Sequence, residues 1–235
     1  MKHAVPVGLV LLMCCGPVVG AGTVPPDAFA FEDQFETYAE GLLSGQGGWE
    51  GDGEVLASPD ARLGAKTLGL SFDGATVTRS VPSFYGIVRL DVFAEPAEWA
   101  AGDACVIEVG ARGRVDARVR LGFDSTVSVL QPGVAGPEWI DAGAWDPRDL
   151  ATVEVRLPGQ EALVVSVGGT ELFSGVTLGA AEKGSSLPSE FLGVTTYGSA
   201  TVFFDNIEVI RTTCSADFDG DSSVNVRDLA VLLSV

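Results

Sequence analysis

Residues Tyr85–Phe93 read YGIVRLDVF, a run in which apolar and polar side chains alternate. A period of two is typical of a β-strand that has one face in a core and the other toward solvent. Runs of the same kind, separated by Gly, Pro, Asp and Ser, are KTLGLSF, ATVTRSV, CVIEVGARG, VDARVRLGF, STVSVL, ATVEVRL, ALVVSVGG, GVTTYG and TVFFDNIEVI. So many short strands with almost no helical periodicity predict an all-β fold, a two-sheet antiparallel sandwich.

The composition limits the partners of such a domain. The chain has 235 residues, of which 46% are hydrophobic and 20% charged, enough for one sizeable core and a small appendage. Its 32 acidic residues outnumber 14 basic ones, and the formal net charge is -18. Phosphate backbones and anionic membrane surfaces repel a chain of this charge, so we expect no nucleic-acid partner.

The first 21 residues are typical of a cleaved secretory signal. A basic residue precedes an apolar run from Val5 to Cys15, and small residues follow up to Ala21. The apolar run is too short to span a bilayer comfortably, and no later segment approaches ~20 apolar residues. We therefore expect a secreted or cell-surface protein without a membrane span.

Removal of the signal would also remove His3, which is the only histidine. Nucleophiles activated by histidine and histidine-ligated zinc sites are then excluded. Of the four cysteines, Cys105 and Cys214 would remain. In an exported protein they form either one disulfide or two unpaired thiols, and the sequence leaves both possibilities open.

Three segments resemble bacterial concanavalin A-like (laminin G or jelly-roll) domains over roughly residues 28–211: FEDQFETYAEGLLSGQGGWEG, AWDPRDLATVEVRLPGQEALVVSVGGTELFSG and FFDNIEVI. The resemblance implies a jelly-roll sandwich in which an early strand near Phe31–Phe35 pairs close to the closing strand. It also implies that Asp205, with backbone carbonyls of the N-terminal strand, holds a structural calcium ion. An ordinary turn or edge aspartate is the alternative for Asp205.

The acids of the predicted strands argue against catalysis. Glycanases need two carboxylates about 5 Å apart when they retain the anomeric configuration, and alternate positions of one strand supply such a pair. Glu108, Asp116 and Glu154 each stand alone in their strands, as isolated surface charges do. We therefore expect a protein that is not an enzyme. The alternative is a polysaccharide-active enzyme, related to glycoside hydrolases, whose site is built by loops.

Aromatic residues in turn-rich segments are candidates for glycan binding, because sugar rings stack on flat aromatic faces. Trp99 and Trp139 are the candidate platform, with Tyr197 near a strand end. A structural role as lids on the ends of the sandwich is the alternative for the two tryptophans. Trp145 and Trp49, in contrast, are expected to pack into the domain.

The C-terminal segment DFDGDSSVNVRD, residues 217–228, has the order of oxygen ligands of an EF-hand calcium loop. Positions 1, 3, 5, 7, 9 and 12 fall on Asp217, Asp219, Asp221, the Ser223 carbonyl, Asn225 and Asp228. Ser222 replaces the glycine usual at position 6, which lowers the expected affinity. A short helix with an apolar stripe follows this loop.

This segment, residues 214–235, resembles one half of a type I dockerin repeat. Dockerins usually carry two repeats, and here only one is present. The resemblance assigns partner contacts to Val226 and Arg227, which replace small hydroxyl residues, so a standard cohesin-like partner is doubtful. The expected cofactor is Ca2+.

Together these features predict an exported, non-catalytic jelly-roll module with a calcium-binding dockerin-like tail. Its expected role is carbohydrate binding, adhesion or extracellular assembly, with a polysaccharide or glycan as partner. The alternatives are the polysaccharide-active enzyme and a purely structural envelope protein.

Overall fold

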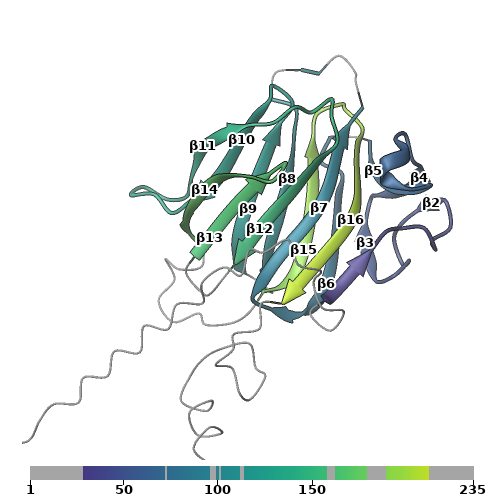
Figure 1. Ribbon diagram of the computed structural model, residues 1–235, viewed down its shortest axis with the longest axis horizontal. Helices are drawn as coiled ribbons and strands as arrows, with labels where there is room; N and C mark the ends of the chain where they lie inside the picture. The colour runs from purple at the N-terminus through teal and green to yellow at the C-terminus, as the bar shows by residue number, and fades with distance from the viewer. Residues whose placement is uncertain are drawn as a thin grey trace, which may run out of the picture.

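The computed structural model describes residues 29–71, 73–95, 99–100, 102–111, 114–157, 162–178 and 189–211 (Figure 1). The predicted signal segment, Cys214, the calcium loop and the dockerin-like helix lie outside these residues. The described residues form two antiparallel sheets that face each other, so the predicted sandwich is confirmed.

The first sheet, sheet A, has the strand order β14-β13-β12-β7-β16-β5-β4-β2, and β1 also pairs with β16. Its strands are β1 (Phe29–Asp33), β2 (Gly41–Leu42), β4 (Glu54–Ala57), β5 (Lys66–Leu70), β7 (Gly86–Ala94), β12 (Ala151–Leu157), β13 (Ala162–Val167), β14 (Thr170–Val176) and β16 (Val202–Arg211). A 3-10 turn, η2 (Ala61–Leu63), joins β4 to β5.

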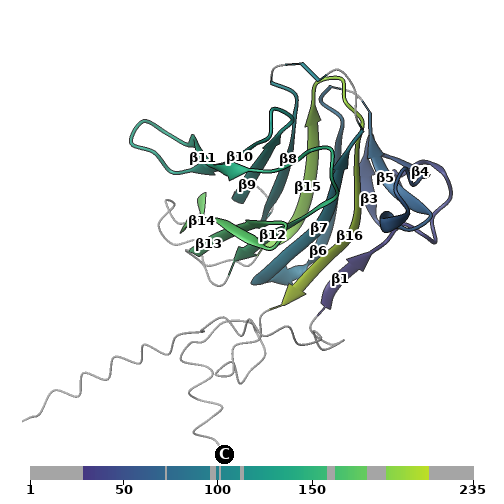
Figure 2. The ribbon, with the colours of Figure 1, turned by 45° about the horizontal axis from the view of Figure 1, so that its top comes forward.

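The second sheet, sheet B, has the order β11-β10-β9-β8-β15-β6-β3. Its strands are β3 (Trp49–Gly51), β6 (Thr76–Phe84), β8 (Ala104–Ala111), β9 (Arg114–Gly122), β10 (Thr126–Gln131), β11 (Glu138–Ala144) and β15 (Ser189–Tyr197). Strands adjacent in each sheet are often distant in sequence, as in a jelly roll. The two hairpins β10–β11 and β13–β14 lie at the same end of the sandwich, away from β2 to β5 (Figures 1 and 2).

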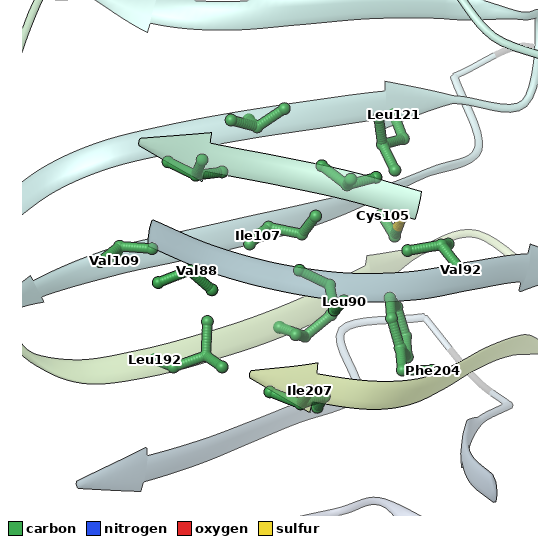
Figure 3. Packing of buried hydrophobic residues seen from close by; sticks show 14 of the residues in the cluster. Val88, Leu90, Val92, Cys105, Ile107, Val109, Leu121, Leu192, Phe204 and Ile207 are labelled. Carbon is green, nitrogen blue, oxygen red and sulfur yellow. The ribbon is translucent and has the colours of Figure 1, made fainter. Parts of the chain in front are cut away.

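Strand β7 shows how the alternating sequence produces the two faces of a sheet. Val88, Leu90 and Val92 are fully buried, whereas Arg89 and Asp91 between them lie on the outer face of sheet A. The buried side chains meet those of Cys105, Ile107, Val109, Leu121, Leu192, Phe204 and Ile207 from both sheets (Figure 3). Each buried aliphatic or aromatic side chain of this core contributes about 1.5–3 kcal/mol of hydrophobic stabilisation.

The pairing of the first and last strands is also confirmed. Strand β1 runs antiparallel to β16, with Phe31 opposite Val209. At the end of β1 the carboxylate of Asp33 accepts hydrogen bonds from the Trp49 indole at 2.8 Å and from the Tyr38 hydroxyl. The expected burial of Trp49 is thereby explained, because its one polar atom has a partner inside the domain.

Trp145 is buried as expected, and its indole donates to the Gly122 carbonyl at 2.8 Å. Cys105 lies in β8 with its thiol in the core, where burial raises its pKa to about 12. Its pairing with Cys214 stays a prediction because Cys214 is outside the described residues. In the part of the chain that the structure describes, no helix is long and apolar enough to cross a membrane.

Candidate functional site

The outer face of sheet B brings side chains of six strands into one row, which we call the central row. Paired residues of antiparallel strands point to the same face, and Leu192 and Val194 of β15 point into the core. Their neighbour Gly193 is therefore on the outer face, between Glu108 of β8 and Thr78 of β6. In order across the sheet, the row consists of Trp139, Leu130, Arg118, Glu108, Gly193 and Thr78.

Glu108 holds a carboxylate near the middle of this row. Its side chain is 24% exposed, and the Arg118 guanidinium of the neighbouring strand donates to its Oε2. Among the described residues, its second oxygen Oε1 has no hydrogen-bond partner. The carboxylate is thus oriented by Arg118 and still open to a ligand on the outer face.

Aromatic side chains share this face with the carboxylate, and Phe191 is the one nearest to it along β15. A Cβ atom added at Gly193 would lie 3.0 Å from the Phe191 ring, so the ring lies beside the bare backbone of Gly193. Tyr197, on the same face of β15, is 47% exposed, and Trp139 at the end of the row is 41% exposed. The predicted platform residue Trp139 therefore shares a face with Tyr197 and with Phe191, which the sequence analysis did not single out.

The hydroxyl groups of the face lie on β6 and β15. The side-chain oxygens of Thr76 and Thr195 are 3.0 Å apart, and Thr78 stands next to Gly193. Flat aromatic rings, hydroxyl groups and one oriented carboxylate are the groups that bind sugar rings and their hydroxyls.

Asp116 is the second acid close to Glu108, and the expectation of a solvated surface charge is wrong for it. It is 6% exposed and lies at a β-bulge of β9, two residues before Arg118. Its carboxylate accepts from the Arg114 guanidinium at 2.6 and 2.9 Å and from the Ser189 hydroxyl at 2.7 Å. These bonds satisfy a buried charge that the sequence alone gives no sign of.

Glu154, the third lone acid of the sequence, lies on the opposite side of the molecule, the outer face of sheet A. Arg89 and Arg156 both donate to it, and its side chain is 13% exposed. It is therefore part of a charge network and not a solvated single charge.

Trp99, the other predicted platform residue, is partly buried. Its ring centroid is 5.6 Å from that of Phe123, its indole donates to the Glu95 carbonyl at 3.1 Å, and the Arg148 guanidinium lies over it. These contacts are those of a packed residue, so the structure does not bring Trp99 and Trp139 together on the sheet B face.

Asp205 of β16 is 1% exposed on the outer side of sheet A. Burial, together with the nearby negative charges of Glu36, Asp91 and Asp33, raises its pKa to about 7. The backbone N–H of Asn206, which donates to it at 2.7 Å, acts in the opposite direction. No group of three or more His, Cys, Asp or Glu side chains within the described residues is arranged to hold a metal ion. The structural calcium at Asp205, which relies on backbone carbonyls, stays a prediction.

The predicted ligands of the calcium loop and the partner contacts Val226 and Arg227 lie outside the described residues, so their arrangement also stays a prediction.

No family model matches the chain, and no curated protein matches it. Solved structures do match. The apo Crh5 transglycosylase is 13% identical with a TM-score of 0.52 over 80% of this chain and 91% of that one. A glycoside hydrolase family 16 endo-glucanase from Bacteroides ovatus is 10% identical with a TM-score of 0.51, over 75% and 99%.

The binding domain of Botulinum neurotoxin DC, solved in complex with rat synaptotagmin II, is 8% identical with a TM-score of 0.52. The match covers 87% of this chain and 52% of that one. At these identities the likeness shows the shared jelly-roll sandwich alone.

The shared fold corrects the prediction of a non-catalytic module. A transglycosylase and an endo-glucanase have this sandwich, so its architecture does not argue against an enzyme. The physical reason for the error is that the sequence analysis sought two acids on one strand. The structure places Glu108 and Asp116 on neighbouring strands, a pairing that alternation along a single strand does not detect.

Proposed function

We propose that this domain is a polysaccharide-active enzyme that binds a glycan chain along the central row of sheet B and cleaves it beside Glu108. The observation that carries the proposal is the row itself, in which an arginine-oriented carboxylate stands between the exposed Trp139 ring at one end and the Thr78 hydroxyl at the other. The shared fold of the transglycosylase and the endo-glucanase supports it.

The dimensions of the row suit a polymer. Strands of a sheet are about 4.8 Å apart, so the six strands from β11 to β6 extend over about 24 Å, the length of several sugar rings. Trp139 would stack on a ring at one end, and Phe191 beside the bare Gly193 on a ring near the carboxylate. The net charge of the chain, -18, favours a neutral polysaccharide over an acidic one.

Cleavage of a glycosidic bond needs one carboxyl group to protonate the leaving oxygen and a second to activate water or attack the sugar. Glu108, with one oxygen open to the outer face, is the first candidate, and Asp116, which is 6% exposed and bonded to Arg114 and Ser189, is the second acid on the neighbouring strand. Asp116 precedes Arg118, the cross-strand partner of Glu108, by two residues and lies at the β-bulge of β9.

In this arrangement Glu108 is the group that contacts the sugar, because one of its oxygens is open to the outer face. Arg118 positions it, and Arg114 and Ser189 position Asp116.

As part of the same proposal, the chain is exported, and the segment from Asp217 to Asp228 binds a calcium ion that orders the C-terminal helix.

Electrophoresis of the whole protein in gels that contain one soluble polysaccharide each, such as mixed-linkage glucan or xylan, tests the binding part. We expect at least one polysaccharide to retard the protein, and Trp139→Ala and Phe191→Ala to relieve the retardation. Leu42→Ala is the control, because Leu42 is 69% exposed at the far edge of sheet A. Retardation that both aromatic variants leave unchanged would show that the glycan binds elsewhere.

A further inference from the structure

A second candidate site lies on the opposite side of the sandwich, on the outer face of sheet A. A pocket of about 460 Å³ is formed there by β7, β12, β13 and the turn between β13 and β14. This volume is within the range of about 300–1,000 Å³ of small-molecule sites. None of the sheet B residues discussed above lines it.

The charged groups of this pocket neutralise one another. Glu154 accepts from Arg89 through one oxygen, at 2.9 and 3.2 Å, and from Arg156 through the other. Arg89 uses its remaining amino group on Glu208, at 2.8 Å. The two guanidinium groups and two carboxylates therefore form a closed network, and the pocket does not need a counter-ion.

Three polar groups are left for a ligand. Ser166 lines the pocket and is 4% exposed, yet its hydroxyl has no hydrogen-bond partner among the residues that the structure describes. The hydroxyl is open to the pocket, where a ligand hydroxyl could replace water as its hydrogen-bond partner. Arg156 bonds Glu154 through Nε, which leaves its terminal amino groups as donors. Thr152 donates its proton to Asp91 at 2.6 Å, so its oxygen is available as an acceptor.

The turn at the edge of the pocket is not covered by other described residues. Gly168 and Gly169 form the tight turn between β13 and β14 with φ of 57° and 78°, a conformation that favours glycine. A Cβ added to either one would meet no atom within 4 Å, so open space lies over the turn. Leu150 supplies the apolar part of the lining.

We propose that this pocket is a second saccharide site that binds one neutral sugar residue or a disaccharide. Sugar hydroxyls both donate and accept, which matches the donors of Arg156, the acceptor of Thr152 and the Ser166 hydroxyl, which does both. An acidic sugar is disfavoured because Asp91 and Glu208 are bonded to the pocket residues Thr152 and Arg89, and both arginines of the pocket are already paired with carboxylates. The proposal does not depend on the activity of sheet B.

The experiment is a titration of the isotope-labelled whole protein with glucose, galactose, mannose and their disaccharides, followed by NMR, with glucuronate as the acidic probe. We expect at least one neutral sugar to shift the amide signals of Ser166, Gly168 and Gly169 in a saturable way. Glucuronate should bind more weakly. Ser166→Ala should weaken binding by roughly two- to tenfold, the effect of one hydrogen bond, whereas Ser174→Ala on β14, outside the pocket, should not.

Glu108→Gln separates this site from the sheet B site, since it should leave the Ser166, Gly168 and Gly169 shifts unchanged. The proposal is overturned if no neutral sugar shifts these signals up to about 50 mM, if glucuronate binds more tightly than the neutral sugars, or if Ser166→Ala binds as well as Ser174→Ala. The shift pattern of the unmodified protein decides the matter even where a variant does not fold.

Discussion

Replacing Asp205 with asparagine should stabilise the protein above neutral pH and have little effect near pH 4. The pKa of this buried carboxyl is raised to about 7, chiefly by burial and then by Glu36, Asp91 and Asp33. In the unfolded chain an aspartate has a pKa of about 3.9. The folded state therefore holds the proton more tightly than the unfolded state does. Its contribution to stability is fully present below pH 3.9 and is lost as the pH rises through 7.

The size of the effect follows from the shift. A rise of about three pKa units at 1.36 kcal/mol per unit corresponds to about 4 kcal/mol lost between pH 4 and pH 8. An asparagine side chain at position 205 cannot ionise. Its side-chain oxygen can still accept the 2.7 Å hydrogen bond that the backbone N–H of Asn206 donates to Asp205. We therefore expect Asp205→Asn to raise the free energy of unfolding at pH 8 by about 2–4 kcal/mol.

Urea unfolding of both proteins at pH 4, 5, 6, 7 and 8, in EDTA and at constant ionic strength, measures this effect. The difference between variant and parent removes the contribution of other titrating groups. It should grow with pH and level off above 7. A difference that stays flat, or that grows toward acid, would refute the account of Asp205 as a buried carboxyl under negative potential. A separate series in calcium would reverse the sign at pH 8 if the predicted structural ion binds there.

Three further predictions rest on other parts of the chain. Trp99→Ala should lower the free energy of unfolding by about 3 kcal/mol because its ring packs on Phe123, whereas the exposed Trp139→Ala should leave the urea midpoint nearly unchanged. Calcium at about 10⁻⁴ to 10⁻³ M should induce helicity in the whole protein by circular dichroism. Asp228→Ala should abolish this response and Glu54→Ala should not. If calcium up to ~10 mM does not change the helicity of the parent protein, the assignment of residues 217–228 as a calcium loop is wrong. The Cys105 thiol should not react with Ellman's reagent until the protein unfolds, because it is buried in the core.

The alternation in the sequence was sufficient to predict the sandwich, since a strand such as β7 must bury Val88, Leu90 and Val92 on one side. The pairing of β1 with β16 required the resemblance to concanavalin A-like domains, because contacts between the ends of a chain leave no periodic signal. Trp49 was correctly expected to be buried, although its hydrogen bond to Asp33 was not foreseen.

The candidate site was harder to predict for a physical reason. Its residues come from strands that are adjacent in space and distant in sequence, so Glu108, Phe191 and Thr78 meet only once the strand order is known. Nothing in the sequence around Asp116 distinguishes it from a surface acid. Its charge can be buried because Arg114 and Ser189 donate hydrogen bonds to it. The Ser166 hydroxyl likewise gains its significance only from the pocket around it.

Hydrolysis by the whole protein with Glu108 replaced tests the central proposal most directly. Parent, Glu108→Gln, Asp116→Asn and Glu50→Gln proteins are incubated with the polysaccharides that retard the parent in gels, and released reducing ends are counted. Glu50 is the matched control, because it is an exposed glutamate opposite Thr78 at the β3 edge of the same face. We expect the parent and Glu50→Gln to release reducing ends at equal rates and Glu108→Gln to lose at least about 100-fold, as removal of an acid-base group does. Equal rates for Glu108→Gln and Glu50→Gln, or no release by the parent from any polysaccharide that it binds, would contradict the proposal.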